Sequence, residues 1–198
     1  MVKVATSHQE ILERFAQVVA KSLRIEASQV TEDAYLDDLG AESLDLAEIT
    51  MEAEEEFDVL IAQKNILRTA TEVFGEDVIV RDGRLTDEGK RFIRRRLPDF
   101  DGELDELTVA DLGKAFLRVG TWVRMIAGLM EHTPAACPGC GQAFGKPLAG
   151  RLKCRDCGLE HDLPSGDDLN RQWVEQYYRE EYVPAQGLVP AAPPASAV

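Results

Sequence analysis

The sequence predicts a mostly α-helical protein: a helical bundle with an inserted subdomain, then a small four-cysteine module and a C-terminal helix. Two observations lead to this prediction. Apolar residues recur at three- and four-residue spacing in several segments, as on the buried face of a helix. All four cysteines fall in two Cys-x-x-Cys pairs. The 198 residues suffice for one medium domain or two small ones, and 44% hydrophobic residues are typical of a folded globular chain.

The first predicted helix covers residues 7–23. Ser7 and Glu10 have the spacing of a capping box, which marks a helix start. Its apolar stripe consists of Ile11, Phe15, Val18, Val19 and Leu23. A loop then leads to a second helix, predicted from Ser43 to about Phe57.

The second helix has one apolar and one acidic face. Its apolar stripe consists of Leu46, Ile49, Ala53 and Phe57, and the opposite face carries Glu48, Glu52, Glu55 and Glu56. Residues 37–58 hold ten acidic side chains and no Lys or Arg, within a chain of net charge −14. Such concentrated charge favours docking to basic protein surfaces and argues against binding of nucleic acid.

Ser43 lies at the start of this acidic helix, after a turn that contains Gly40. The free N–H groups and the positive dipole end of a helix favour a phosphate ester at this position. No histidine lies within thirty residues of Ser43, so no local base could activate it as a nucleophile. The sequence therefore predicts that Ser43 is modified; the alternative is an ordinary N-cap serine.

The runs Leu36–Asp45 and Glu54–Asp58 resemble the acyl carrier protein family. The resemblance implies that Ser43 carries 4'-phosphopantetheine, whose thiol holds acyl groups as thioesters. It also implies a partner-docking surface on the acidic helix, formed by Asp38, Leu39, Glu42, Leu44, Ala47, Glu48 and Met51. One position departs from the family, which usually has Asp immediately before the serine where this chain has Glu42.

A further helix is predicted to begin at Thr108, with Asp111 as its capping partner. Its apolar stripe consists of Leu112, Phe116, Val119, Val123 and Ile126. The run Leu107–Leu112 also resembles the opening of the last helix of carrier proteins, although about fifty residues separate it from the acidic helix. We therefore expect the bundle to comprise residues 1–62 and 101–131.

Residues 63–100 form the predicted insertion. Apolar spacing at Ile66, Leu67, Ala70, Val73 and Phe74 indicates a helix. A short extended pair follows around Asp82-Gly83, and then a helix that is capped by Thr86 and reaches Leu97. That helix carries a basic cluster of Lys90, Arg91, Arg94, Arg95 and Arg96. The cluster is either a solvated helix face or a surface that pairs with the acidic helix or with an acidic surface of a partner.

The pairs Cys137/Cys140 and Cys154/Cys157 are separated by thirteen residues, and each is followed by glycine. Two such turns can bring four thiolates to one tetrahedral metal ion. The region resembles a zinc ribbon, whose four-cysteine site has no open position and is structural. Iron is the alternative, because the paired motif also resembles rubredoxin-like modules. His132 and His161 are interpreted as bystanders or as groups that contact the ligands, and not as ligands themselves.

The ribbon-like module with its terminal helix is predicted to cover residues 132–182. Leu169, Trp173 and Tyr177 recur every four residues, and we expect this helix to pack on the ribbon. The alternative is an aromatic surface that recruits a partner. Residues 183–198, rich in Pro and Ala, are predicted to be a disordered tail.

These features predict an acyl carrier that is not itself an enzyme. Its partners would be a phosphopantetheinyl transferase and acyl-handling enzymes of a specialised lipid, polyketide or related pathway, since the insertion and ribbon add surface that a general carrier does not need. The alternatives are a zinc-ribbon adaptor with a vestigial bundle and a rubredoxin-like electron-transfer protein.

The sequence shows no signal for secretion or membrane insertion. The N-terminus lacks the apolar core of a signal peptide, and the most apolar stretch, 115–130, contains two arginines. A cytoplasmic protein without a membrane span is expected.

Overall fold

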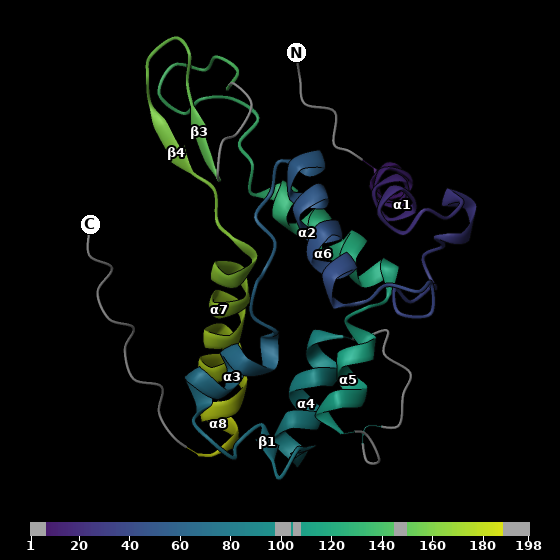
Figure 1. The fold of residues 1–198 in the computed structure, drawn as a ribbon. Helices are drawn as coiled ribbons and strands as arrows, with labels where there is room; N and C mark the ends of the chain where they lie inside the picture. Colours follow the sequence, from purple (N-terminus) through teal and green to yellow (C-terminus); the bar gives the residue numbers. More distant parts are fainter. Residues whose placement is uncertain (1–6, 98–103, 105–107, 145–149, 188–198) are drawn as a thin grey trace. The chain divides into compact units, whose positions relative to one another are not determined.

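The computed structural model describes residues 7–97, 104, 108–144 and 150–187, and it confirms the mostly helical fold (Figure 1). The chain divides into two compact units. Unit 1 comprises Met1–Gln63 and Ala110–Asp167, and unit 2 comprises Lys64–Val109 and Asp168–Val198. The domain boundaries expected from the sequence stay a prediction.

Unit 1 begins with α1 (His8–Leu23). The hydroxyl of Ser7 accepts a hydrogen bond from the backbone N–H of Glu10 at 3.1 Å, which confirms the predicted cap. The helix ends where Arg24 turns left-handed, with φ 57°. A 3-10 turn, η1 (Ala27–Gln29), lies in the loop that leads to α2 (Ser43–Phe57).

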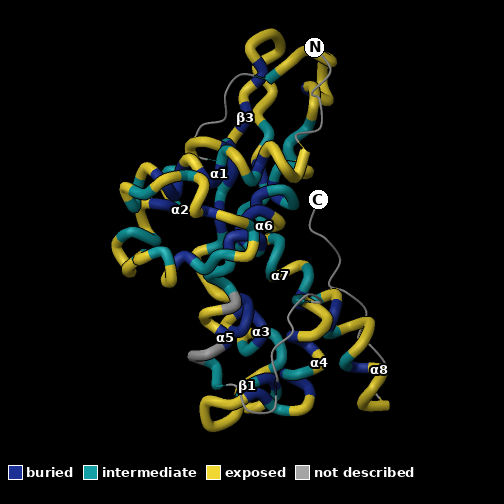
Figure 2. The backbone as a smooth tube through the Cα atoms, turned by 90° about the vertical axis from the view of Figure 1, so that its right-hand side faces the viewer, coloured by how far each residue is buried: buried dark blue, intermediate teal, exposed yellow. Residues whose placement is uncertain are grey.

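The core of unit 1 forms where α1 packs against α2 and against α6 (Val119–Glu131). Figure 2 shows the buried inner faces of these three helices in dark blue. Phe15 is fully buried and stacks on Trp122, with ring centroids 5.5 Å apart. Ile49 and Ile126 are also fully buried. Each such side chain contributes roughly 1.5–3 kcal/mol by leaving water.

The stretch after Thr108, predicted as one helix, is broken into α5 (Val109–Ala115) and α6. The break lies where the loop before Ser43 pairs with the backbone: Leu36 N–H donates to Leu117 O, and Val119 N–H donates to Ala34 O, both at 2.9 Å. These bonds replace helical ones, so the apolar spacing continues although the helix does not.

The ribbon in unit 1 is a hairpin of β3 (Arg151–Lys153) and β4 (Glu160–Asp162), paired antiparallel. Its base is closed by the bond from Leu163 N–H to Gly150 O at 2.7 Å. Gly166 N–H then donates to Leu60 O at 2.8 Å, which ties the base of the ribbon to the segment after α2.

Unit 2 contains the predicted elements of the insertion. They are α3 (Ile66–Phe74), β1 (Val80–Arg81), β2 (Arg84–Leu85) and α4 (Asp87–Arg96). The β1–β2 turn has positive φ at Asp82 (51°) and Gly83 (73°), as a type I′ hairpin requires. The Thr86 hydroxyl caps α4 by accepting from Gly89 N–H at 3.0 Å.

The terminal helix α7 (Gly166–Tyr177) packs its aromatic residues on the insertion, which corrects the expected packing on the ribbon. The Phe92 ring of α4 lies 5.2 Å from Trp173 and 5.4 Å from Tyr177, centroid to centroid. Phe74 of α3 lies 6.1 Å from Tyr177. Short α3 and α4 cannot bury these large rings between themselves, so the aromatic stripe of α7 completes their core.

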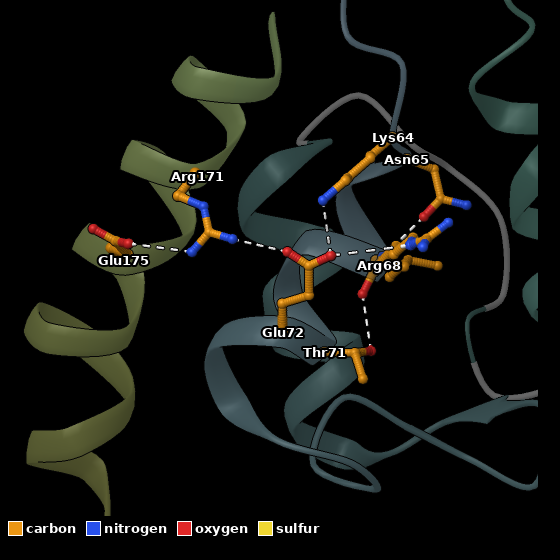
Figure 3. Close-up of polar contacts among 8 residues, drawn as sticks. Lys64, Asn65, Arg68, Thr71, Glu72, Arg171 and Glu175 are labelled. Atoms are coloured by element: carbon orange, nitrogen blue, oxygen red, sulfur yellow. Dashed lines mark hydrogen bonds and ion pairs between the residues drawn. The ribbon is translucent and has the colours of Figure 1, made fainter.

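Ion pairs join the same elements at their surface (Figure 3). Glu72 of α3 accepts from Lys64 at 3.0 Å and from Arg171 of α7 at 2.8 Å. The hydrogen bond from Lys64 lowers the pKa of Glu72, so the carboxylate stays charged in mildly acidic solution. Because these pairs are largely exposed, they contribute little to the stability of unit 2.

The basic cluster of α4 has partners within unit 2. Arg91 pairs with Glu88, and Arg95 pairs with Glu181 at 3.0 Å. Arg96 donates to Asn170 at 3.1 Å, and its guanidinium carbon lies 5.3 Å from the centre of the Trp173 ring. Burial lowers the pKa of Arg96. Arg95 and Arg96 therefore join α4 to the C-terminal segment and not to the acidic helix, whereas Arg91 pairs within α4 itself.

The predicted disordered tail is ordered in its described part. After α7 come the π-helical segment η2 (Tyr178–Tyr182) and α8 (Val183–Ala185), with Val183 buried. Residues 188–198 lie outside the described residues. Within the described ranges, no helix has the length and apolar character needed to cross a membrane.

Candidate modification site and cysteine cluster

The loop before Ser43 is fixed by its own backbone. Leu36 is fully buried, and its carbonyl accepts from Ala41 N–H at 2.9 Å. Gly40 N–H donates to Asp37 O at 3.0 Å, and Gly40 has φ 95°, which favours glycine. The loop therefore delivers the chain to the start of α2 in one defined conformation.

Ser43 is the first residue of α2 and is exposed. Glu42, the residue before it, is the N-cap, and its N–H donates to Asp45 Oδ2 at 2.8 Å. The ordinary N-cap interpretation of Ser43 is therefore wrong. Its hydroxyl lies at the helix end where unpaired N–H groups and the dipole favour a phosphate.

The exposed face of α2 combines apolar and acidic side chains. Leu44 is 81% exposed and Met51 is 70% exposed. Ala47, Glu48 and Glu55 are also exposed, and their spacing puts them on the same side of the helix. Large exposed apolar side chains are typical of interaction surfaces. Of the other predicted recognition residues, Asp38 and Glu42 are exposed and Leu39 is half-buried.

Basic residues of α1 cover one edge of the acidic helix, a feature that the sequence analysis missed. Lys21 pairs with Glu52 at 2.6 Å, and Arg14 pairs with Glu56 at 2.8 Å. The hydrogen bond with Glu52 raises the pKa of Lys21. Arg14 and Lys21 are seven residues apart, which puts them on one face of α1, two turns from each other. This spacing could have indicated that both pair with the acidic helix.

A third missed cation, Lys114 of α5, lies over the loop before Ser43. Its Nζ is 2.9 Å from Asp38 Oδ1 and 3.7 Å from Asp37 Oδ2. It also lies 5.5 Å from the centre of the Tyr35 ring. The hydrogen bond with Asp38 raises the pKa of Lys114, so the ammonium stays charged at neutral pH. Lys114 and Asp38 are 76 positions apart, so no short-range spacing in the sequence indicates that they pair.

The four cysteines meet at one point, as their spacing predicts. Their Sγ atoms all lie within 4.8 Å of one another, with Cys137 and Cys157 3.6 Å apart and Cys140 and Cys154 3.4 Å apart. Tetrahedral zinc with bonds of about 2.3 Å separates its sulfurs by about 3.8 Å. Among the described residues this cluster contains no histidine. The donor set therefore fits a tetrahedral metal ion.

Both cysteine turns have the same backbone geometry. Gly141 N–H donates to Cys137 O at 2.8 Å, and Gly158 N–H donates to Cys154 O at 3.1 Å. Both glycines have φ 75°, which explains the glycine after each pair. Backbone N–H groups of Cys157 and Asp156 lower the pKa of Cys154 to about 7, whereas the pKa of Cys140 and that of Cys157 are raised in the same cluster.

Comparison with known proteins places the N-terminal part of the chain, from within α1 to within α3, in a family. The model of the phosphopantetheine attachment site matches residues 13–71, which include α2 and Ser43. The chain is 39% identical over 66 residues to the acyl carrier protein of Thermotoga maritima, covering 33% of this chain and 82% of that protein. No solved structure matches the chain. On these grounds the chain belongs to the acyl carrier protein family.

Proposed function

We propose that this protein carries acyl groups as thioesters on a 4'-phosphopantetheine arm attached to the Ser43 hydroxyl. A separate transferase would supply the arm from coenzyme A: the Ser43 oxygen forms a phosphodiester bond, the pyrophosphate bond of coenzyme A breaks, and adenosine 3',5'-bisphosphate leaves with the serine proton lost to solvent. The observation that carries the proposal is the position of Ser43, exposed at the first residue of α2 and inside the matched segment. The fixed loop before it supports the same role, because a transferase needs the hydroxyl in a defined place.

The exposed face of α2 is the proposed docking surface for partner enzymes. Leu44 and Met51 would fill apolar depressions, while Glu48 would meet a basic side chain, with Leu39, Glu42 and Ala47 at the margin. Asp38, which the family resemblance also indicates, lies on the loop before the helix, where it pairs with Lys114. The protein would do no chemistry of its own. Its contribution is to hold the thioester at high effective concentration beside a docked enzyme. The additional unit 2 and ribbon favour a specialised lipid, polyketide or related pathway.

The cysteine cluster is proposed to hold a structural zinc ion through Cys137, Cys140, Cys154 and Cys157. Four thiolates leave no open coordination position, so the ion would order the ribbon and not act on a substrate. Iron would fit the same donors and would favour an electron-transfer role. A colourless protein with one zinc ion per chain supports the structural site, whereas a reducible visible band would support iron.

Intact mass spectrometry after incubation with coenzyme A and a broad-specificity phosphopantetheinyl transferase tests the carrier role. The wild-type chain is expected to gain one phosphopantetheine, and Ser43→Ala none, because the acceptor oxygen is removed. Ser7→Ala is the matched control, since Ser7 is another serine at a helix start and caps α1. That variant should be modified like the wild type.

Two results would contradict the carrier proposal. An unmodified wild-type chain, under conditions that modify a known carrier, would favour the adaptor with a vestigial bundle. A mass gain that persists in Ser43→Ala would place the arm on another residue.

A further inference from the structure

Lys114 is a cation that lies over the approach to Ser43 but comes from outside the acidic helix. Its Nζ contacts one carboxylate oxygen of Asp38 at 2.9 Å and one of Asp37 at 3.7 Å. The ammonium group of Lys114 therefore forms ion pairs with two acidic side chains on the loop before the candidate attachment site. The ring of Tyr35 flanks the ammonium on the same loop.

The loop does not need Lys114 to keep its shape. Leu36 N–H donates to Leu117 O, Leu36 O accepts from Ala41 N–H, and the Leu36 side chain is fully buried. The Lys114 side chain is 49% exposed and that of Asp38 is 62% exposed, so their pair stabilises the fold little. Lys114 instead reduces the negative charge that an approaching protein meets at Asp37 and Asp38.

Cations from a neighbouring helix also pair with acidic side chains of α2. Lys21 and Arg14 of α1 pair with Glu52 and Glu56, whereas Glu48 and Glu55 remain exposed on the face that carries Leu44 and Met51. Cations from α1 and α5 therefore reduce the negative potential at two margins of the acidic region. The acidic charge that a partner can contact is concentrated on the exposed face of α2.

We propose that Lys114 is a specificity-determining residue that withdraws Asp37 and Asp38 from partner docking, so that basic partner enzymes bind the α2 face and not the loop. The proposal rests on the carrier function proposed above. A guanidinium or ammonium group that approaches Asp38 meets the charge of Lys114 and has to displace it. Enzymes that depend on the loop carboxylates are disfavoured by this repulsion, as in specificity achieved by a repulsive element.

The rate of Ser43 modification by a transferase with a basic docking surface tests the proposal. In Lys114→Met the side chain keeps its length but loses its charge, so the two aspartates become available. We expect the KM for the carrier to fall roughly two- to fivefold at low salt, with kcat unchanged. The difference should shrink at high salt, because exposed charges are screened. Lys114→Arg retains the charge and should behave like the wild type.

Lys64→Met is the matched control. Lys64 is a similarly exposed lysine, paired with Glu72 at 3.0 Å in unit 2, and its loss changes the net charge by the same amount. An equal fall in KM in this control would attribute the effect to net charge and overturn the proposal. An unchanged or raised KM in Lys114→Met would also overturn it, and a lower kcat would assign Lys114 a positioning role instead.

The failure of this proposal differs from the failure of the carrier proposal. If the wild-type chain is modified at Ser43 and Lys114→Met behaves identically, only the role of Lys114 is wrong. If the wild-type chain accepts no arm at all, both proposals are wrong.

Discussion

Replacing Cys154 with serine is expected to abolish the proposed metal binding and to unfold the ribbon. Cys154 is buried, and its Sγ lies 3.4 Å from that of Cys140 at the centre of the cluster. The ribbon's described hairpin has one well-buried apolar side chain, Leu152. Such a small core does not fold without the free energy of metal binding.

Elemental analysis of the purified chain measures the first effect, with metal content expected to fall from about one ion per chain to nearly none. Hydrogen exchange measures the second. Amides of β3 and β4 should lose protection, whereas α1 should keep it because its core with α2 and α6 does not use the ribbon.

His161→Ala is the matched control for the cysteine variant. His161 follows the second cysteine pair in sequence, and its ring lies 6.3 Å from that of Phe144, but it is not part of the cluster. This variant should retain the ion. A Cys154→Ser protein with full metal content, or a His161→Ala protein without metal, would show that the four thiolates are not the ligand set.

The second large effect is expected from Phe92→Ala, which should lower the free energy of unfolding of unit 2 by about 3–5 kcal/mol. Phe92 is 0% exposed and touches the rings of Phe74, Trp173 and Tyr177. Its removal leaves a cavity where α3, α4 and α7 meet. The remaining rings cannot fill that cavity without giving up the contacts that they keep, because Trp173 stacks on Tyr177 and Phe74 packs edge-to-face on Tyr178 and Tyr182.

The two tryptophans allow each unit to be followed separately. Trp122 lies in unit 1 and Trp173 in unit 2. In a Trp122→Phe background, urea unfolding followed by Trp173 fluorescence should shift to a lower midpoint in Phe92→Ala. The exposed Arg94→Ala on the same helix is the control and should shift little. Equal midpoints for Phe92→Ala and Arg94→Ala would contradict the assignment of Phe92 to the core.

Features set by local spacing were predictable from the sequence. Ser7 and Thr86 cap their helices as predicted, because a cap depends on residues three positions apart. The cysteine pairs meet because each Cys-x-x-Cys turn fixes two ligands locally. The exposed place of Ser43 at the start of α2 follows from the same kind of signal.

Features that depend on distant partners were not predictable in the same way. The break between α5 and α6 arises because Leu36 and Ala34 take backbone bonds that an isolated helix would have kept. The aromatic stripe of α7 was visible, but its spacing does not say which surface it covers. Lys114 reaches Asp38 only after the fold has brought α5 to the loop.

The order of the chain has a consequence for synthesis on the ribosome. The insertion with Phe74 and Phe92 is made early, but the rings that cover it, from Trp173 to Tyr182, come near the end of the chain. At ordinary translation rates the interval is on the order of ten seconds. Throughout that time the apolar surface that these rings later cover stays open on the nascent chain, so the core of the insertion is completed only after Trp173 to Tyr182 have been made.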